Sequence, residues 1–185
     1  MGLGVLASLA LGCQLDKLVS APDQHPTGGV VAARLEFTSQ PGPATAGVPL
    51  RPVVAVTVLD SAGRIVEGFH GSVVISLAAD PANGTLSGTL TATPTNGVAT
   101  FSDLRVNRAA SGYQLGAAAS GLSGAMSTGF AITPGPATRI AFAVQPSNSQ
   151  AGSPIQPAVT VKALDSLGNV VTNFSGTITT SLATD

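Results

Sequence analysis

The sequence predicts an all-β protein built from two antiparallel β-sandwich units in tandem, the second of which is truncated. First, the chain contains a long internal repeat, because residues 34–80 align without a gap on residues 139–185 after a shift of 105 residues. Second, short apolar runs of period two alternate with turn residues, which is the pattern of β-strands. Third, 22 glycines and 13 prolines accompany 44% hydrophobic residues, so turns are plentiful and a core is still possible. The repeat matches one sandwich domain in length and exceeds the roughly 20–50 residues of solenoid repeats.

Composition excludes several classes of function. Charged residues make up only 9% of the chain, the net charge is −1, and the two lysines, Lys17 and Lys162, are far apart. Nucleic acid is therefore not expected as a partner, because phosphate binding needs a concentrated cationic face. Aromatic residues amount to 4% with no tryptophan, so the core is expected to consist mostly of Val, Leu, Ile and a few Phe. The single cysteine, Cys13, rules out a disulfide within the chain.

Residues 1–13 are expected to form a signal peptide that ends in a lipid-acceptor cysteine. Residues 2–12 are an uncharged apolar run, shorter than the roughly 20 residues that span a bilayer and typical of a signal-peptide core. The residues ending in Gly12 and Cys13 resemble a bacterial lipoprotein signal, which implies cleavage before Cys13 and lipid attachment to its thiol. The sequence departs from that pattern in lacking a basic residue before the apolar run and in having Ala10 where leucine is commonest. A plain secretory signal, or a membrane anchor truncated at its front, is the alternative.

Residues 14–31 are expected to form a flexible tether, because prolines and glycines interrupt any regular element. Fully extended, this tether would reach roughly 60 Å. Lipid on Cys13 would bind the protein to a membrane, and the tether would hold the first unit away from the membrane surface. The expected location is therefore the outer membrane or the cell surface, with secretion as the alternative.

Comparison of the two copies predicts which residues form the core of the first unit, residues 32–135. Along three predicted strands the equivalent positions of the two copies are apolar, except that Thr180 stands in place of Ile75, while most of their neighbours change. Because successive side chains on a strand point to opposite faces, the recurring residues are expected to point inward. They are Leu35 and Phe37, then Val54, Val56 and Val58, then Val73, Ile75 and Leu77. The other face is expected to point to solvent, as at Thr57, which Lys162 replaces in the second copy.

Turn residues separate the predicted strands. Asp60 and Gly63 begin and end an Asp-Ser-x-Gly sequence that recurs from Asp165, and such a sequence is typical of a type I turn. A calcium loop is the alternative, but one carboxylate is far from the six or more oxygens that calcium takes. An Asn-Gly turn at residues 96–97 precedes strands expected at 98–101, 104–106, 113–119 and 128–132, and nothing longer than a turn is expected to be helical.

These motifs, in their order and spacing, resemble the bacterial immunoglobulin-like repeat of the invasin/intimin and filamin-like group. The resemblance covers about 150 of the 185 residues and includes Val-x-Val-x-Leu-Asp-x-x-Gly, Phe-x-Gly-Ser-Val, the Asn-Gly-Val-Ala-Thr-Phe of residues 96–101 and the Gly-Tyr of residues 112–113. It implies an immunoglobulin-like β-sandwich outside the cytoplasm, used as a rod segment or presentation module of a surface protein or adhesin. It also implies that Tyr113 is a buried tyrosine near the start of a late strand.

No catalytic, metal or cofactor site is predicted. A Ser-His-Asp triad needs a histidine as base, but His25 lies in the tether and His70 is replaced by Ser175 in the second copy. We therefore expect His70 to be an exposed surface residue. Two histidines and one cysteine do not make an ordinary zinc site, and the six phenylalanines fall at positions expected to belong to the core. The only site residue predicted is Cys13, as the site of lipidation.

Residues 136–185 are expected to be the first half of a second unit. They lack counterparts of residues 98–132, so we expect them to fold poorly or to expose an apolar face. The predicted function is a non-catalytic, surface-anchored stalk or adhesin segment, with a host or cell-surface protein or a glycan as possible partner. The alternatives are accessory domains of an exported enzyme whose catalytic domain lies beyond Asp185, or a carbohydrate-binding module.

Overall fold

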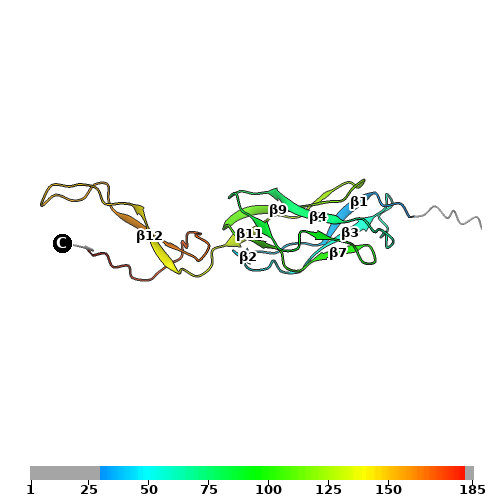
Figure 1. Cartoon of the computed structure of the whole chain (residues 1–185), viewed down its shortest axis with the longest axis horizontal. Helices are drawn as coiled ribbons and strands as arrows, with labels where there is room; N and C mark the ends of the chain where they lie inside the picture. Colours follow the sequence, from blue (N-terminus) through cyan, green and yellow to red (C-terminus); the bar gives the residue numbers. More distant parts are fainter. Residues whose placement is uncertain (1–29, 182–185) are drawn as a thin grey trace, which may run out of the picture.

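The protein is all-β, as the sequence predicts. A computed structural model describes residues 30–181, which contain 13 strands and no helix (Figure 1). The strands are β1 (Arg34–Ser39), β2 (Ala44–Thr45), β3 (Val54–Leu59), β4 (Val73–Ala79), β5 (Leu86–Ser87), β6 (Thr91–Ala92), β7 (Val98–Phe101), β8 (Arg105–Val106), β9 (Ala110–Ala118), β10 (Ala125–Met126), β11 (Phe130–Thr133), β12 (Arg139–Val144) and β13 (Thr160–Leu164). No helix able to cross a membrane exists in this part of the chain.

The first unit is a β-sandwich-like pair of sheets around one core. One sheet has the order β1-β3-β7, and the other has the order β2-β11-β9-β4-β6, with β10 paired to β9. Most pairs are antiparallel, whereas β2 and β11 run parallel. The strands β5 and β8 form a separate short pair. Apolar side chains from both sheets meet in a single cluster between them.

The repeat comparison identified this core correctly. All eight predicted inward residues are buried except Leu77, which is half-buried beside an irregularity in the pairing of β4 with β9. On the opposite face of β4, Ser72, Val74 and Ser76 are exposed. Alternate burial arises because one face of each sheet packs on the other sheet and the second face meets water.

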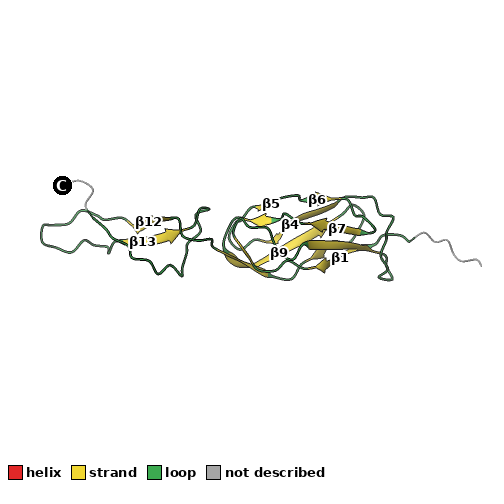
Figure 2. Cartoon of the chain, turned by 90° about the horizontal axis from the view of Figure 1, so that it is seen from below, coloured by secondary structure: helices red, strands yellow, loops and turns green. Residues whose placement is uncertain are grey.

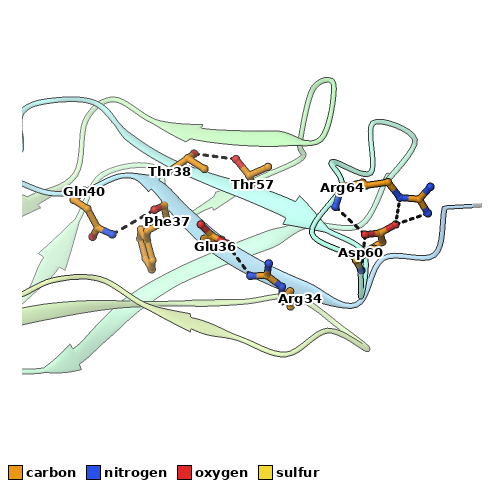
Figure 3. Close-up of polar contacts among 9 residues, drawn as sticks. Arg34, Glu36, Phe37, Thr38, Gln40, Thr57, Asp60 and Arg64 are labelled. Atoms are coloured by element: carbon orange, nitrogen blue, oxygen red, sulfur yellow. Dashed lines mark hydrogen bonds and ion pairs between the residues drawn. The ribbon is translucent and has the colours of Figure 1, made fainter.

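Thr57 differs from its predicted exposure. It lies on the outer face of β3, yet it is only 2% exposed. The strand β3 is central, between β1 and β7, so neighbouring side chains cover its outer face. The Thr57 hydroxyl is hydrogen-bonded to that of Thr38 on β1 at 2.9 Å (Figure 3). This pairing explains how a polar group is tolerated there without water.

The second unit reproduces the first pair of strands. Arg139 pairs with Leu164 in the β12–β13 ladder as Arg34 pairs with Leu59 in the β1–β3 ladder, and the register shift recurs near the end of both. Residues 178–181, whose equivalents lie in β4, form no strand. In the first unit β4 is held between β9 and β6, and the described part of the second unit has no counterpart of either. A strand needs a hydrogen-bonded neighbour, which local sequence alone does not supply.

The two units lie end to end along the longest axis of the molecule (Figures 1 and 2). The described chain starts beyond β1 at one end of this axis, and the β12–β13 pair lies towards the other (Figures 1 and 2). Cys13, the predicted signal peptide and the tether up to residue 29 lie outside the described residues.

Candidate functional site

Of the two histidines weighed as a catalytic base, the structure describes His70. His70 is exposed in the connection between β3 and β4. Within residues 30–181, no group of three or more His, Cys, Asp or Glu side chains could hold a metal ion. The predicted lipidation site, Cys13, lies outside this range.

Two carboxylates of the first unit hold loops in place. One oxygen of Asp80 accepts a hydrogen bond from the Gly84 amide at 2.7 Å. Asp103 accepts hydrogen bonds from both the amide and the hydroxyl of Thr89, at 2.9 and 3.1 Å. The bond from the Thr89 amide is the main cause that keeps the pKa of Asp103 below its usual value. These side chains therefore organise turns and are occupied by main-chain donors.

The turn that begins at Asp60 is complete within the first unit. One Asp60 carboxylate oxygen accepts hydrogen bonds from the amides of Ala62 and Arg64, at 2.9 and 2.8 Å. The other oxygen accepts a bond of 2.7 Å from the Arg64 guanidinium (Figure 3). These bonds, above all the one from the Arg64 amide, lower the pKa of Asp60. Both oxygens of the Asp60 carboxylate are thus bonded to donors of its own turn.

The equivalent turn of the second unit bonds differently. One oxygen of Asp165 accepts bonds from the amides of Leu167 and Asn169, as Asp60 does in its own turn. The other accepts a bond from the Asn169 side chain and a second bond, of 2.9 Å, from the amide of Gly135 in the segment that joins the units. Burial of Asp165 acts to raise its pKa, but these hydrogen bonds outweigh it, and the pKa is lowered.

Asn169 connects the two units directly. Its side-chain oxygen accepts a hydrogen bond of 2.9 Å from the amide of Ala109, and its side-chain nitrogen donates one of 3.0 Å to the carbonyl of Asn107. Asn169 is 6% exposed and Asp165 only 1%. These contacts hold the second unit against the segment between β8 and β9 of the first.

The second unit also has an exposed apolar face, as the sequence predicts. Ile140 and Phe142 are 53% and 47% exposed, whereas Leu35 and Phe37 at the equivalent positions of the first unit are 3% and 6% exposed. An open hollow of about 410 Å³ lies on this face. Its lining consists of Phe142, Pro146, Ile155, Val159, Val161, Thr180 and Ser181. The prediction that all phenylalanines belong to a core is therefore wrong for Phe142 and for Phe174, which is 41% exposed.

Tyr113 is buried near the start of β9, as the sequence resemblance implies. It is 0% exposed and packs against Phe130 with ring centroids 5.9 Å apart. Its hydroxyl donates a hydrogen bond of 3.0 Å to the carbonyl of Arg108, and burial raises its pKa. Gly84 is close by, because a Cβ at that position would lie 2.9 Å from the Tyr113 hydroxyl. The tyrosine therefore fixes the loop before β9 to the core.

Sequence reasoning missed the junction between the units. The signal that could have found it lies in the positions where the two copies differ, since Ala62 and Arg64 of the first turn correspond to Leu167 and Asn169 of the second. No protein-family model matches this chain, and no curated protein is detectably similar to it in sequence.

Proposed function

We propose that the chain is a non-catalytic structural module of an exported protein: an array of immunoglobulin-like units used as a stalk or adhesin segment. Lipid on Cys13 holds the array at the outer membrane or cell surface, and the residues up to 31 separate the first unit from the membrane. The partner at the far end is a surface protein or a glycan.

The observation that carries the proposal is the end-to-end arrangement of the units (Figure 2). A chain that enters one end of the first unit and leaves at the other adds length with each unit. The buried core of the first unit and the direct hydrogen bonds to the second favour a stiff connection over a loose one. Stiffness and length are the properties that a stalk needs.

The strand order supports the immunoglobulin-like character of the first unit. One sheet of β1, β3 and β7 faces a second of β2, β11, β9 and β4, with the early strand β2 parallel to the last strand β11. Tyr113 near the start of β9, bonded to a carbonyl five residues upstream, matches the tyrosine corner of immunoglobulin-like sandwiches. The carboxylates Asp60 and Asp103, engaged by main-chain and side-chain donors, fit a structural role.

The anchor can be tested by expressing the full chain in a bacterium that processes lipoproteins and supplying radiolabelled palmitate. The wild-type protein should take up label and sediment with membranes. Cys13→Ser should take up none and appear in the soluble fraction, while the nearby control Ser20→Ala should behave as wild type. A wild-type protein released unlabelled into the medium would favour the plain secretory signal instead.

The stalk can be tested separately by small-angle X-ray scattering of the full-length Cys13→Ser protein. An elongated particle with one dominant long axis is expected. A compact particle, with the second unit folded back on the first, would contradict the stalk.

A further inference from the structure

The end of the first unit presents a set of groups that receives the following unit. The carbonyl of Asn107 and the amide of Ala109 are two positions apart on one stretch of main chain, and both point to the same partner, Asn169. A carboxamide matches such a pair because it has one acceptor oxygen and one donor nitrogen. Gly135, in the joining segment, adds a third main-chain donor, which bonds to Asp165.

Gly47 adds an apolar contact to this receiving surface. A Cβ at Gly47 would lie 2.9 Å from the Cδ1 of Leu167, so the leucine occupies space that only glycine leaves open. The φ of Gly47 is +77°, a conformation that other residues adopt at a cost. Leu167 and Asn169 therefore meet the receiving surface at two different points, one apolar and one polar.

The first unit has different residues at these two turn positions. Ala62 lacks the length of Leu167, and Arg64 carries a guanidinium, which has donors and no acceptor. An arginine in place of Asn169 would leave the Ala109 amide without its acceptor. In the first turn the guanidinium bonds back to Asp60, so Arg64 completes its own turn.

We propose that Leu167 and Asn169 are a docking determinant, which fixes a unit of the array onto the end of the unit before it. The receiving surface, formed by Gly47, Asn107, Ala109 and Gly135, accepts a repeat unit whose Asp-Ser-x-Gly-x turn has leucine third and asparagine fifth. A unit with alanine and arginine at these positions, as at Ala62 and Arg64, does not dock. The inference deepens the stalk proposal, and its biological meaning rests on that proposal.

The direct test is hydrogen exchange of single amides, measured by NMR in the full-length Cys13→Ser protein. The amides of Ala109 and Gly135 should be protected. Asn169→Arg, which installs the residue of the first unit, should speed exchange at Ala109 on the order of tenfold, because the amide loses its acceptor. Core amides such as that of Val56 should exchange as before, which shows that the first unit remains folded.

A matched control and a second measurement keep the test decisive. Ser166→Ala changes an exposed residue of the same turn and should leave exchange at Ala109 unchanged. Spin labels on cysteines placed at Ser72 and Thr160, one exposed position in each unit, should give a narrow distance distribution that broadens in Asn169→Arg.

Equal exchange at Ala109 in wild type and Asn169→Arg would overturn the determinant, as would equally broad distance distributions in both. These outcomes are separable from failure of the anchor, because every protein measured here lacks Cys13. A missing lipid on the wild-type chain would remove the surface anchor and leave the docking result intact.

Discussion

Phe37 and Phe142 occupy equivalent positions in the two units, and replacing each by alanine is expected to have very different effects. Phe37 lies on β1 opposite Val56 and is 6% exposed, whereas Phe142 lies on β12 opposite Val161 and is 47% exposed. Both are phenyl rings at equivalent positions of ladders that have the same register. The difference in free energy should therefore come from what covers each ring, and not from strand propensity.

The magnitude follows from burial. Truncating a fully buried phenylalanine to alanine typically costs about 3–5 kcal/mol, because a cavity is left in addition to the lost transfer free energy. Phe142 is covered over only about half its surface, so roughly half of the about 1.5–3 kcal/mol for burying a large apolar side chain is at stake. No closed cavity forms there, because the site is open to solvent. We expect Phe142→Ala to cost about 1 kcal/mol, and only in the second unit.

The chain offers a natural probe for this comparison. Its single tyrosine, Tyr113, is buried in the core of the first unit, so tyrosine fluorescence during urea unfolding reports on that unit alone. Phe37→Ala should lower the free energy of unfolding seen by Tyr113 by about 3–5 kcal/mol, and Phe142→Ala should leave it within about 0.5 kcal/mol of wild type. If Phe37→Ala does not fold, Phe37→Leu should show a smaller loss, of about 1–2 kcal/mol.

A loss above about 2 kcal/mol at Tyr113 from Phe142→Ala would show that the two units share one core, and the account of separate units would be wrong. A loss below about 1 kcal/mol from Phe37→Ala would contradict the burial of the ring. Phe142→Ser offers a further check, because this variant should bind less of a hydrophobic dye than wild type, with an unchanged unfolding transition at Tyr113.

Three more predictions concern the first unit. Tyr113→Phe should lower its free energy of unfolding by about 1 kcal/mol, because the hydroxyl loses its main-chain acceptor; circular dichroism would measure this. Gly97→Ala should lower the free energy of unfolding by about 1–3 kcal/mol, because the φ of Gly97 is +77° and the new Cβ would lie 2.5 Å from a side-chain methyl. Gly112→Ala should cost less, because Gly112 has a φ of +91° but no atom within 4 Å of the new Cβ. Acid should destabilise the unit, because the pKa values of Asp60 and Asp103 are lower in the folded state than their ordinary values. The stability that these two carboxylates contribute is present above pH about 4 and is lost as the pH falls through their folded-state pKa values.

Each of these has an outcome that would contradict it. If Tyr113→Phe leaves the free energy of unfolding unchanged, the hydroxyl is bonded as well to water in the unfolded state as to the main chain in the folded state. Equal costs for Gly97→Ala and Gly112→Ala would mean that backbone strain alone matters and the close approach does not. If the urea midpoint at pH 3 equals that at pH 7, the carboxylates are no better bonded in the folded state than in the unfolded one.

The sequence was sufficient to predict the all-β class and most of the core because the repeat samples each strand twice. Val54 and Val56 recur as valines, and their faces follow from the period of two. The predicted exposure of Thr57 is wrong because comparing the two copies shows only which residues vary. It does not show that β3 is the central strand of its sheet, with both faces covered. Exposure at an outward position depends on neighbouring strands that local sequence does not specify.

The junction was beyond the reach of periodicity for a different reason. Asn169 and Asn107 are 62 residues apart in sequence, and the Asn169 side chain bonds to the main-chain carbonyl of Asn107, a group that every residue has. Residues 178–181 illustrate the same point, since they correspond in sequence to part of β4 and yet form no strand. In both cases the outcome is decided by which segments meet in space.

The parallel pairing of β2 with β11 determines how the first unit would respond to tension. Ala44 lies opposite Ile132 and Thr45 opposite Thr133, so the chain enters this pair through β2 and leaves it through β11. A force that draws the two ends of the unit apart pulls these strands in opposite directions along their length. The hydrogen bonds between the two strands are then loaded in shear and share the force. They do not open one after another, as they would if the strands were peeled apart from one end. Rupture of this strand pair under load is governed by the rate of unfolding and not by the equilibrium stability of the core.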